Sequence, residues 1–279
     1  MKTILRKGKI EILIPEKTGG GLTGETHMVT YDSQKYVLRK CKTLSKAKYY
    51  EHLSNKFEKY GFLPKFLGRI GKNVFYEYIG GRDLRRNEKL ENIKEVGKII
   101  SILNRFEFKD SFSYPLEIYL NELVTGKYRN LGKVALAREM RGIRHNPKKL
   151  LSKEDKKNIL EKIAQLRKDI DLKIIYECTD PTPGNFRIRD GKIYLVDIDS
   201  IKAGYKGIGI SKFFLQWGKT KGKKDKFIEG YGKKNIKFLD SKYRSFVDLN
   251  FLVRRLWFEV QTGKNYKKSL EKINNLIKD

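Results

Sequence analysis

The stretch YECTDPTPGNFRIRDGKIYLVDIDS, residues 176–200, contains two short apolar runs that each end on a carboxylate. Asp180 follows the first run, and Asp197 and Asp199 close the second. An Asp-Gly pair between the runs is the strongest short signal for a β-hairpin. We therefore expect one hairpin whose two strands bring these acids to the same edge.

The polar residues of this stretch suit a metal and phosphate site. Asp180 and Asn185 form the pattern D-x-x-x-x-N, and Asp197 ends the partner strand of the expected hairpin. Carboxylate and amide oxygens are hard donors, which suit Mg²⁺ carrying phosphates. Asn185 and Asp197 would hold the metal, which leaves Asp180 to orient and deprotonate an acceptor hydroxyl. Taken alone, such a trio is more often ordinary turn chemistry.

The remaining chain divides into a strand-rich and a helix-rich part. Strand-like runs surround a glycine-rich turn in the first third, and a helix is predicted from a cap near Ser45 to Gly61. After residue 80 the apolar residues recur at helical spacing, and Ser152 with Asp155 resembles a capping box. We expect an α+β chain with a small sheet-rich N-terminal lobe, residues 1–79, and a larger helical C-terminal lobe, residues 80–279.

This order of motifs resembles the protein-kinase-like superfamily, and most closely its aminoglycoside phosphotransferase and choline kinase branch. That branch has a loop H-G-D-x-x-x-x-N before a strand that ends in I-D, and here the loop is CTDPTPGN and the strand IYLVDID. The resemblance covers nearly the whole chain from about Gly19. It implies a two-lobed fold and a kinase that uses ATP and Mg²⁺.

The resemblance also implies roles for single residues. Asp180 matches the catalytic base, and Asn185 and Asp197 match the metal ligands. Arg39 stands where the family places a basic residue that contacts phosphate, with Glu51 as its ion-pair partner. The further nucleotide-binding positions are Gly20, Gly21 and Gly24 in the loop over the phosphates, and Glu77, Tyr78 and Ile79 in the hinge beside adenine.

The sequence departs from the family pattern at two positions. Cys178 replaces the loop histidine and reads as a small buried apolar residue, not as a nucleophile. Arg39 replaces the commoner lysine, and Lys40 is an alternative phosphate contact. Asp199 is either a third metal ligand or a hydrogen-bond acceptor for the loop, and we favour the second.

The charge balance favours a polyanionic partner over the alternative, which is a solvated surface in a protein from a lysine-rich proteome. The chain has 62 Lys and Arg against 33 Asp and Glu, a net charge of +29. Basic residues gather in segments 126–149 and 212–237, and lysines alternate with aromatic residues in the second. This pattern suits looped or single-stranded RNA, whose phosphates take the charge and whose bases stack on the rings. Part of the aromatic content must be ordinary helix core, so the stacking expectation is the weaker of the two. The candidate RNA-binding residues are Lys127, Arg129, Arg138, Arg141, Arg144, Lys148, Lys219, Lys221, Lys223 and Lys224.

We therefore expect a kinase whose acceptor is an RNA hydroxyl, a ribose 2′-hydroxyl of tRNA in the first instance, and no DNA partner. On charge and branch the chain looks like an archaeal RNA kinase related to the aminoglycoside phosphotransferases. One alternative is a small-molecule or protein Ser/Thr kinase with a basic surface. The third is a non-catalytic RNA-binding protein on a kinase fold.

Other classes of protein are disfavoured by the sequence. Glu11 interrupts the short apolar run near the N-terminus, which argues against a signal peptide, and no run approaches the ~20 residues of a membrane span. Cys41 and Cys178 lie far apart without ligands at metal spacing, so a structural zinc is not expected. We expect a cytoplasmic protein.

Overall fold

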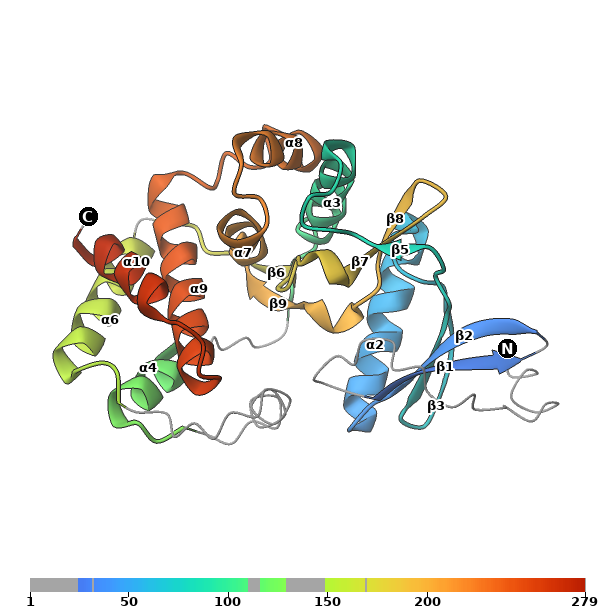
Figure 1. The fold of residues 1–279 in the computed structure, drawn as a ribbon, viewed down its shortest axis with the longest axis horizontal. Helices are drawn as coiled ribbons and strands as arrows, with labels where there is room; N and C mark the ends of the chain where they lie inside the picture. Colours follow the sequence, from blue (N-terminus) through green and yellow to red (C-terminus); the bar gives the residue numbers. More distant parts are fainter. Residues whose placement is uncertain (1–24, 32, 110–115, 129–148, 169, 279) are drawn as a thin grey trace. The chain divides into compact units, whose positions relative to one another are not determined.

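The computed structural model describes residues 25–31, 33–109, 116–128, 149–168 and 170–278. The contacts within it divide the chain into two compact units. Unit 1 consists of Met1–Asn92 with Thr182–Ile201, and unit 2 of Ile93–Pro181 with Lys202–Asp279. Residues 80–92 and 182–201, which the sequence analysis placed in the C-terminal lobe, therefore group with the N-terminal sheet in unit 1. Figure 1 shows the elements of both units.

Within the described residues of unit 1, four antiparallel strands form a sheet in the order β1-β2-β4-β3. These strands are β1 (Glu25–Tyr31), β2 (Gln34–Lys40), β3 (Phe66–Ile70) and β4 (Asn73–Glu77). Neighbouring residues of β2 point to opposite faces. Leu38 packs with Val29 and Phe75 on one face, while Arg39, opposite Val74, is buried on the other.

Helix α2 (Leu44–Phe57) packs on β3 and β4 of this sheet (Figure 1). Its N-terminus is capped by Thr43, whose side chain accepts from the backbone N–H of Lys46 at 3.2 Å, so the cap lies two residues before the expected Ser45. A 3₁₀ turn (Glu58–Tyr60) and Gly61 at φ 63° end the segment, as predicted. The buried face carries Ala47, Tyr50, Leu53, Ser54 and Phe57.

The described residues of unit 1 also form a three-stranded sheet, in the order β5-β7-β8. The strands are β5 (Arg82–Asp83), β7 (Phe186–Arg189) and β8 (Lys192–Leu195). Asp190 (φ 51°) and Gly191 (φ 74°) form the turn between β7 and β8, and two positive φ angles are what a type I′ hairpin requires. The Asp-Gly hairpin signal is confirmed.

The expected partners of this hairpin were wrong, however. The apolar run before Asp180 forms β6 (Ile174–Cys178), which pairs with β9 (Ile201–Tyr205) and not with the strand that leads to Asp197. The physical reason is that a tight Asp-Gly turn joins only the strands next to it, and these are β7 and β8. Asp180 and Asp197 therefore follow strands of two different sheets.

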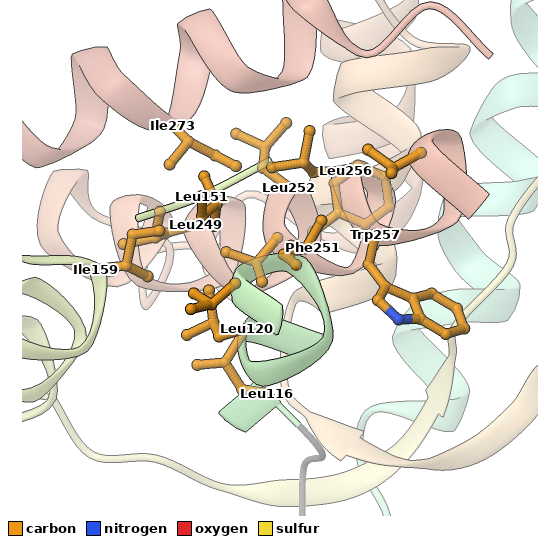
Figure 2. Packing of buried hydrophobic residues seen from close by; sticks show 14 residues of the cluster. Leu116, Leu120, Leu151, Ile159, Leu249, Phe251, Leu252, Leu256, Trp257 and Ile273 are labelled. Atoms are coloured by element: carbon orange, nitrogen blue, oxygen red, sulfur yellow. The ribbon is translucent and has the colours of Figure 1, made fainter. Parts of the chain in front are cut away.

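Unit 2 is built mainly from helices around α9 (Ser241–Gln261), which packs against α4 (Leu116–Thr125), α6 (Lys153–Lys168), α7 (Ile208–Gln216) and α10 (Lys267–Lys278). Most of α3 (Leu90–Leu103) and α8 (Lys221–Tyr231) also belong to it. Figure 2 shows how leucines of α4 and α9 meet Ile159 of α6 and Ile273 of α10 in one apolar core.

Polar contacts fix the start of α6 and join α4 to α9. Ser152 and Asp155 form the predicted capping box at the start of α6: the backbone N–H of each donates to the side chain of the other, at 2.8 and 3.0 Å. Trp257 Nε1 donates to the buried Glu122 at 2.6 Å. Within the described ranges, none of these helices combines the length and apolar character that spanning a membrane requires.

Candidate active site

A cavity in unit 1 collects most of the residues that the sequence analysis selected for nucleotide and metal binding. Its volume of about 450 Å³ lies in the range of small-ligand pockets. Met28, Val37 and Ile198 contribute apolar surface, which suits a flat aromatic ligand. The predicted residues that line it are Arg39, Glu77, Tyr78, Ile79, Asn185 and Asp197.

The predicted hinge, at the end of β4, is held by two arginines of β7. Arg189 donates to the Glu77 carboxylate at 2.9 Å, and Arg187 donates to the Ile79 carbonyl at 2.9 Å and to Asp83 at 2.8 Å. Sequence reasoning missed these contacts. The available signal was the alternation of Arg187 and Arg189 in β7, which puts both side chains on one face of the strand.

Among the described residues, Arg39 is one of two arginines that line the cavity, and Arg187 is the other. Its side chain is largely buried, and Nη1 lies 3.2 Å from Oδ1 of Asp197. Burial lowers the pKa of the Arg39 guanidinium, but Tyr50, Asp197 and Asp199 outweigh it and hold that pKa above its ordinary value. Lys40 is exposed and is not among the residues lining the cavity. Of the two candidates for the phosphate contact, Arg39 is the one that lines the cavity.

The predicted ion pair between Arg39 and Glu51 was wrong. Glu51 Oε2 instead accepts from Nε of Arg69 in β3, at 2.7 Å. The reason lies in the helix geometry, because successive residues of a helix are turned by about 100°. Tyr50 occupies the buried face of α2, which leaves Glu51 at its half-exposed edge.

Asn185 and Asp197 are held next to each other by the backbone. The N–H of Val196 donates to the Asn185 carbonyl at 2.9 Å. Because Val196 directly precedes Asp197, this bond holds Asn185 beside Asp197. Asp197 in turn caps a 3₁₀ turn (Ile198–Ser200), where its Oδ1 accepts from the backbone N–H of Asp199 at 3.2 Å. The sequence therefore fixes this pair through the hairpin and the turn that follows it.

The two side chains fit a magnesium ion that arrives with phosphates. Mg²⁺ keeps several waters and is commonly bound through one or two carboxylates together with substrate phosphates. Asn185 and Asp197 supply an amide oxygen and a carboxylate at the wall of one cavity. In the described part of the chain, no cluster of three or more His, Cys, Asp or Glu forms an all-protein metal cage.

Asp180, the predicted base, lies in unit 2, after β6. Its carboxylate is 42% exposed and pairs with Nζ of Lys212, on α7, at 2.5 Å. Lys212 itself is only 19% exposed. Cys178 at the end of β6 forms no disulfide and is fully buried, in agreement with its interpretation as a packing residue.

The predicted phosphate and RNA contacts are described only in part. Gly20, Gly21 and Gly24, and the basic residues Arg129, Arg138, Arg141, Arg144 and Lys148, lie outside the described residues. Lys127, Lys219 and Lys221 are exposed, and Lys223 and Lys224 are half-buried at the start of α8. These lysines present positive charge on unit 2.

All the aromatic residues of segment 212–237 are buried, whereas only part of them was expected in the core, so the predicted stacking of bases on them was wrong. Phe213 and Phe227 stack on each other with ring centroids 4.4 Å apart and are fully buried. Phe214, Trp217 and Tyr231 are also buried around them. The alternation reflects the apolar faces of α7 and α8, so these rings hold the two helices together.

Comparison with solved structures identifies the fold. Aminoglycoside phosphotransferase APH(4)-Ia superposes with a TM-score of 0.63 at 10% identity, over 99% of this chain and 96% of that one. Choline kinase LicA from Streptococcus pneumoniae gives 0.53 at 15% identity, over 97% and 92%. Spectinomycin phosphotransferase APH(9)-Ia, solved with ADP and spectinomycin, gives 0.57 at 15%, over 93% and 86%.

Neither a protein-family model nor a curated protein sequence matches the chain. The structural similarity nevertheless spans nearly the whole chain and nearly the whole of these kinases. The chain therefore has the protein-kinase-like fold in the form shared by choline kinases and aminoglycoside phosphotransferases. The expected α+β architecture, with a strand-rich N-terminal part and a helical C-terminal part, is confirmed.

Proposed function

We propose that this protein is a phosphotransferase that moves the γ-phosphate of ATP to a hydroxyl group. The observation that carries the proposal is the cavity of unit 1, where Arg39, Asn185, Asp197 and the hinge line one space. An aromatic base, a polyphosphate and a metal ion require these groups together. A structural relative bound to ADP supports ATP as the donor.

In the proposed mechanism each residue has one task. The guanidinium of Arg39 binds phosphate oxygens, and the hinge backbone binds adenine. Asn185 and Asp197 would hold Mg²⁺, which supplies charge neutralisation for the phosphates. Asp180 takes the proton of the acceptor hydroxyl while the hydroxyl oxygen forms a bond to the γ-phosphorus. The bond between the γ-phosphorus and the bridging oxygen of the β-phosphate breaks, which releases ADP.

RNA is the acceptor class that we propose, with a ribose 2′-hydroxyl of tRNA as the first candidate. The support is the net charge of +29 and the exposed lysines at Lys127, Lys219 and Lys221. A phosphate backbone would neutralise this charge, whereas a cationic metabolite would be repelled by it. With the aromatic residues of α7 and α8 buried, the proposal rests on phosphate contacts and not on base stacking.

A small-molecule acceptor is the second candidate, because the structural relatives include a choline kinase and a spectinomycin phosphotransferase. The two acceptor classes differ in how phosphorylation depends on salt concentration. RNA phosphorylation must weaken as salt screens the phosphate contacts, while phosphorylation of a small cation gains nothing from the basic surface.

The test incubates the protein with γ-labelled ATP and Mg²⁺ in three parallel reactions, which contain total RNA, total protein or a metabolite extract. We expect label in the RNA, and loss of all label in Asp180→Asn. Label in the metabolites alone would replace the RNA acceptor by a small molecule. No labelled product in any arm, together with no nucleotide binding, would overturn the phosphotransferase itself.

A further inference from the structure

The contact that α2 makes with Arg39 is an aromatic one. The guanidinium carbon of Arg39 lies 4.9 Å from the centre of the Tyr50 ring. Tyr50 is 1% exposed and belongs to the buried face of α2. A cation over the face of a buried aromatic ring is attracted by the ring quadrupole, and the attraction grows when water is excluded. Tyr50 thus fixes the plane in which the guanidinium lies.

The other end of Tyr50 is fixed by Asp199. The Tyr50 hydroxyl donates to Oδ1 of Asp199 at 3.0 Å, and Nζ of Lys46, one turn earlier on α2, lies 2.9 Å from the same oxygen. Burial holds the pKa of the Tyr50 phenol well above its ordinary value, so the hydroxyl remains a donor at physiological pH. Asp199 is therefore bound to two residues of α2.

These contacts close a ring of interactions inside unit 1. Oδ1 of Asp197 accepts from Arg39 Nη1 and from the backbone N–H of Asp199, both at 3.2 Å. Asp199 accepts from Tyr50, and the ring of Tyr50 packs under Arg39. Each member restrains its two neighbours, so that α2, β2 and the 3₁₀ turn after β8 are tied at one point.

Burial of a guanidinium requires such compensation. Arg39 is 8% exposed, and a buried cation is tolerated only when it is paired and hydrogen-bonded. Asp197 is one partner, but in the proposed mechanism its carboxylate would also hold the metal. The Tyr50 ring and the charge of Asp199 are partners of Arg39 that have no task at the metal.

We propose that Tyr50 and Asp199 are the positioning residues for Arg39, which orient its guanidinium toward the nucleotide phosphates. They do this in place of the acid on α2 that the sequence analysis had expected at Glu51. The inference rests on the proposed function, since it assigns how the phosphate contact of that function is held. It adds that α2 is linked to the nucleotide site through Tyr50 and through Asp199 in the 3₁₀ turn after β8.

The test compares Tyr50→Phe with Tyr49→Phe. Both variants remove one hydroxyl from the same helix, and Tyr49 bonds to the Ile201 carbonyl at 3.2 Å, just after the same 3₁₀ turn. A general loosening of α2 would affect both variants alike. The measurements are MgADP affinity by calorimetry, the KM for ATP, and the melting temperature without nucleotide.

We expect Tyr50→Phe to weaken MgADP binding and raise the KM for ATP roughly fivefold or more, with the KM for the acceptor unchanged. Tyr49→Phe should stay within about twofold of the wild type. Asp199→Asn, which keeps the shape and removes the charge, should follow Tyr50→Phe.

Equal nucleotide affinities in the wild type and in Tyr50→Phe and Asp199→Asn would overturn the positioning role while leaving the proposed function intact. The same loss in Tyr50→Phe and Tyr49→Phe would also overturn it. A wild-type protein that fails to bind MgADP would instead overturn the proposed function, and the positioning role with it.

Discussion

Lys212 on α7 holds the carboxylate of Asp180 after β6, with Nζ 2.5 Å from Oδ1. Lys212 is four-fifths buried, while Asp180 remains open to solvent, so the pair is anchored on the lysine side. An anchored cation beside a carboxylate fixes the direction of that carboxylate. In the proposed mechanism the oriented carboxylate takes the proton of the acceptor hydroxyl.

Replacing this lysine tests its role directly. We expect Lys212→Met to lower kcat by about tenfold or more and to leave MgADP affinity unchanged, because Asp180 loses its orientation and the cavity of unit 1 loses nothing. Lys212→Arg should retain most of the activity, since it keeps a cation of similar length. A Lys212→Met variant with wild-type kcat would reduce the pair to a surface contact.

Glu51 should be dispensable for nucleotide binding. Its partner is Arg69 and not Arg39, and a half-exposed ion pair of this kind contributes about 0–1 kcal/mol. We therefore expect Glu51→Gln to keep the KM for ATP within about twofold of the wild type, whereas Arg39→Met raises it about tenfold or more. Steady-state kinetics at varied ATP check both. A large rise in Glu51→Gln would restore the original pairing.

Glu177 in β6 gives unit 2 a pH-dependent stability. It is fully buried, one oxygen accepts from the N–H of Gly207 at 2.8 Å, and burial raises the pKa of its carboxyl to about 7. A carboxyl with a raised folded pKa contributes stability below its unfolded pKa of about 4.5 and loses it as the pH rises through about 7.

The matched comparison is Glu177→Gln, which keeps the shape without the charge. We expect the melting temperature of the variant, taken relative to that of the wild type, to rise as the pH is raised from about 5 to about 8. The corresponding change in the difference of unfolding free energy is up to about 3 kcal/mol. Titrations common to both proteins cancel in this difference. A difference that is flat across this range would show that Glu177 does not titrate there.

Salt dependence separates the two acceptor classes. If Lys219 and Lys221 contact phosphates, the slope of log affinity for tRNA against log salt should become shallower by about 0.7–0.9 for each contact removed. We expect Lys219→Glu with Lys221→Glu to weaken tRNA binding and leave MgADP affinity unchanged. The control reverses Lys153 and Lys157, which are exposed on α6 and give the same net charge. If both double variants lost the same tRNA affinity, net charge alone would account for the loss, and Lys219 and Lys221 would not be specific phosphate contacts.

Local rules predicted much of this structure. The Asp190–Gly191 turn, the capping box at Ser152 and the αL end at Gly61 are each set by a few adjacent residues, and all three are confirmed. The cavity residues from Arg39 to Asp197 were found because a kinase-like pattern fixes their spacing. The strand-rich and helical parts followed from the periodicity of the apolar residues.

Contacts between distant segments could not be read in the same way. The pairing of β6 with β9, the choice of Arg69 for Glu51, and the placement of Tyr50 between Arg39 and Asp199 depend on how packed elements meet. The aromatic residues near the lysines carried two possible readings, core or stacking surface, and only the packing of α7 on α8 decides between them.

MgADP calorimetry and labelled-ATP turnover on three matched Asp→Asn variants form the most direct measurement of the proposed chemistry. We expect Asp197→Asn to weaken MgADP binding and remove turnover, and Asp180→Asn to bind MgADP normally with no turnover. Asp190→Asn, in the exposed hairpin turn where Asn is equally favoured, should match the wild type in both. Full turnover in Asp180→Asn, or MgADP binding that ignores Asp197→Asn, would contradict the assignment of base and metal site.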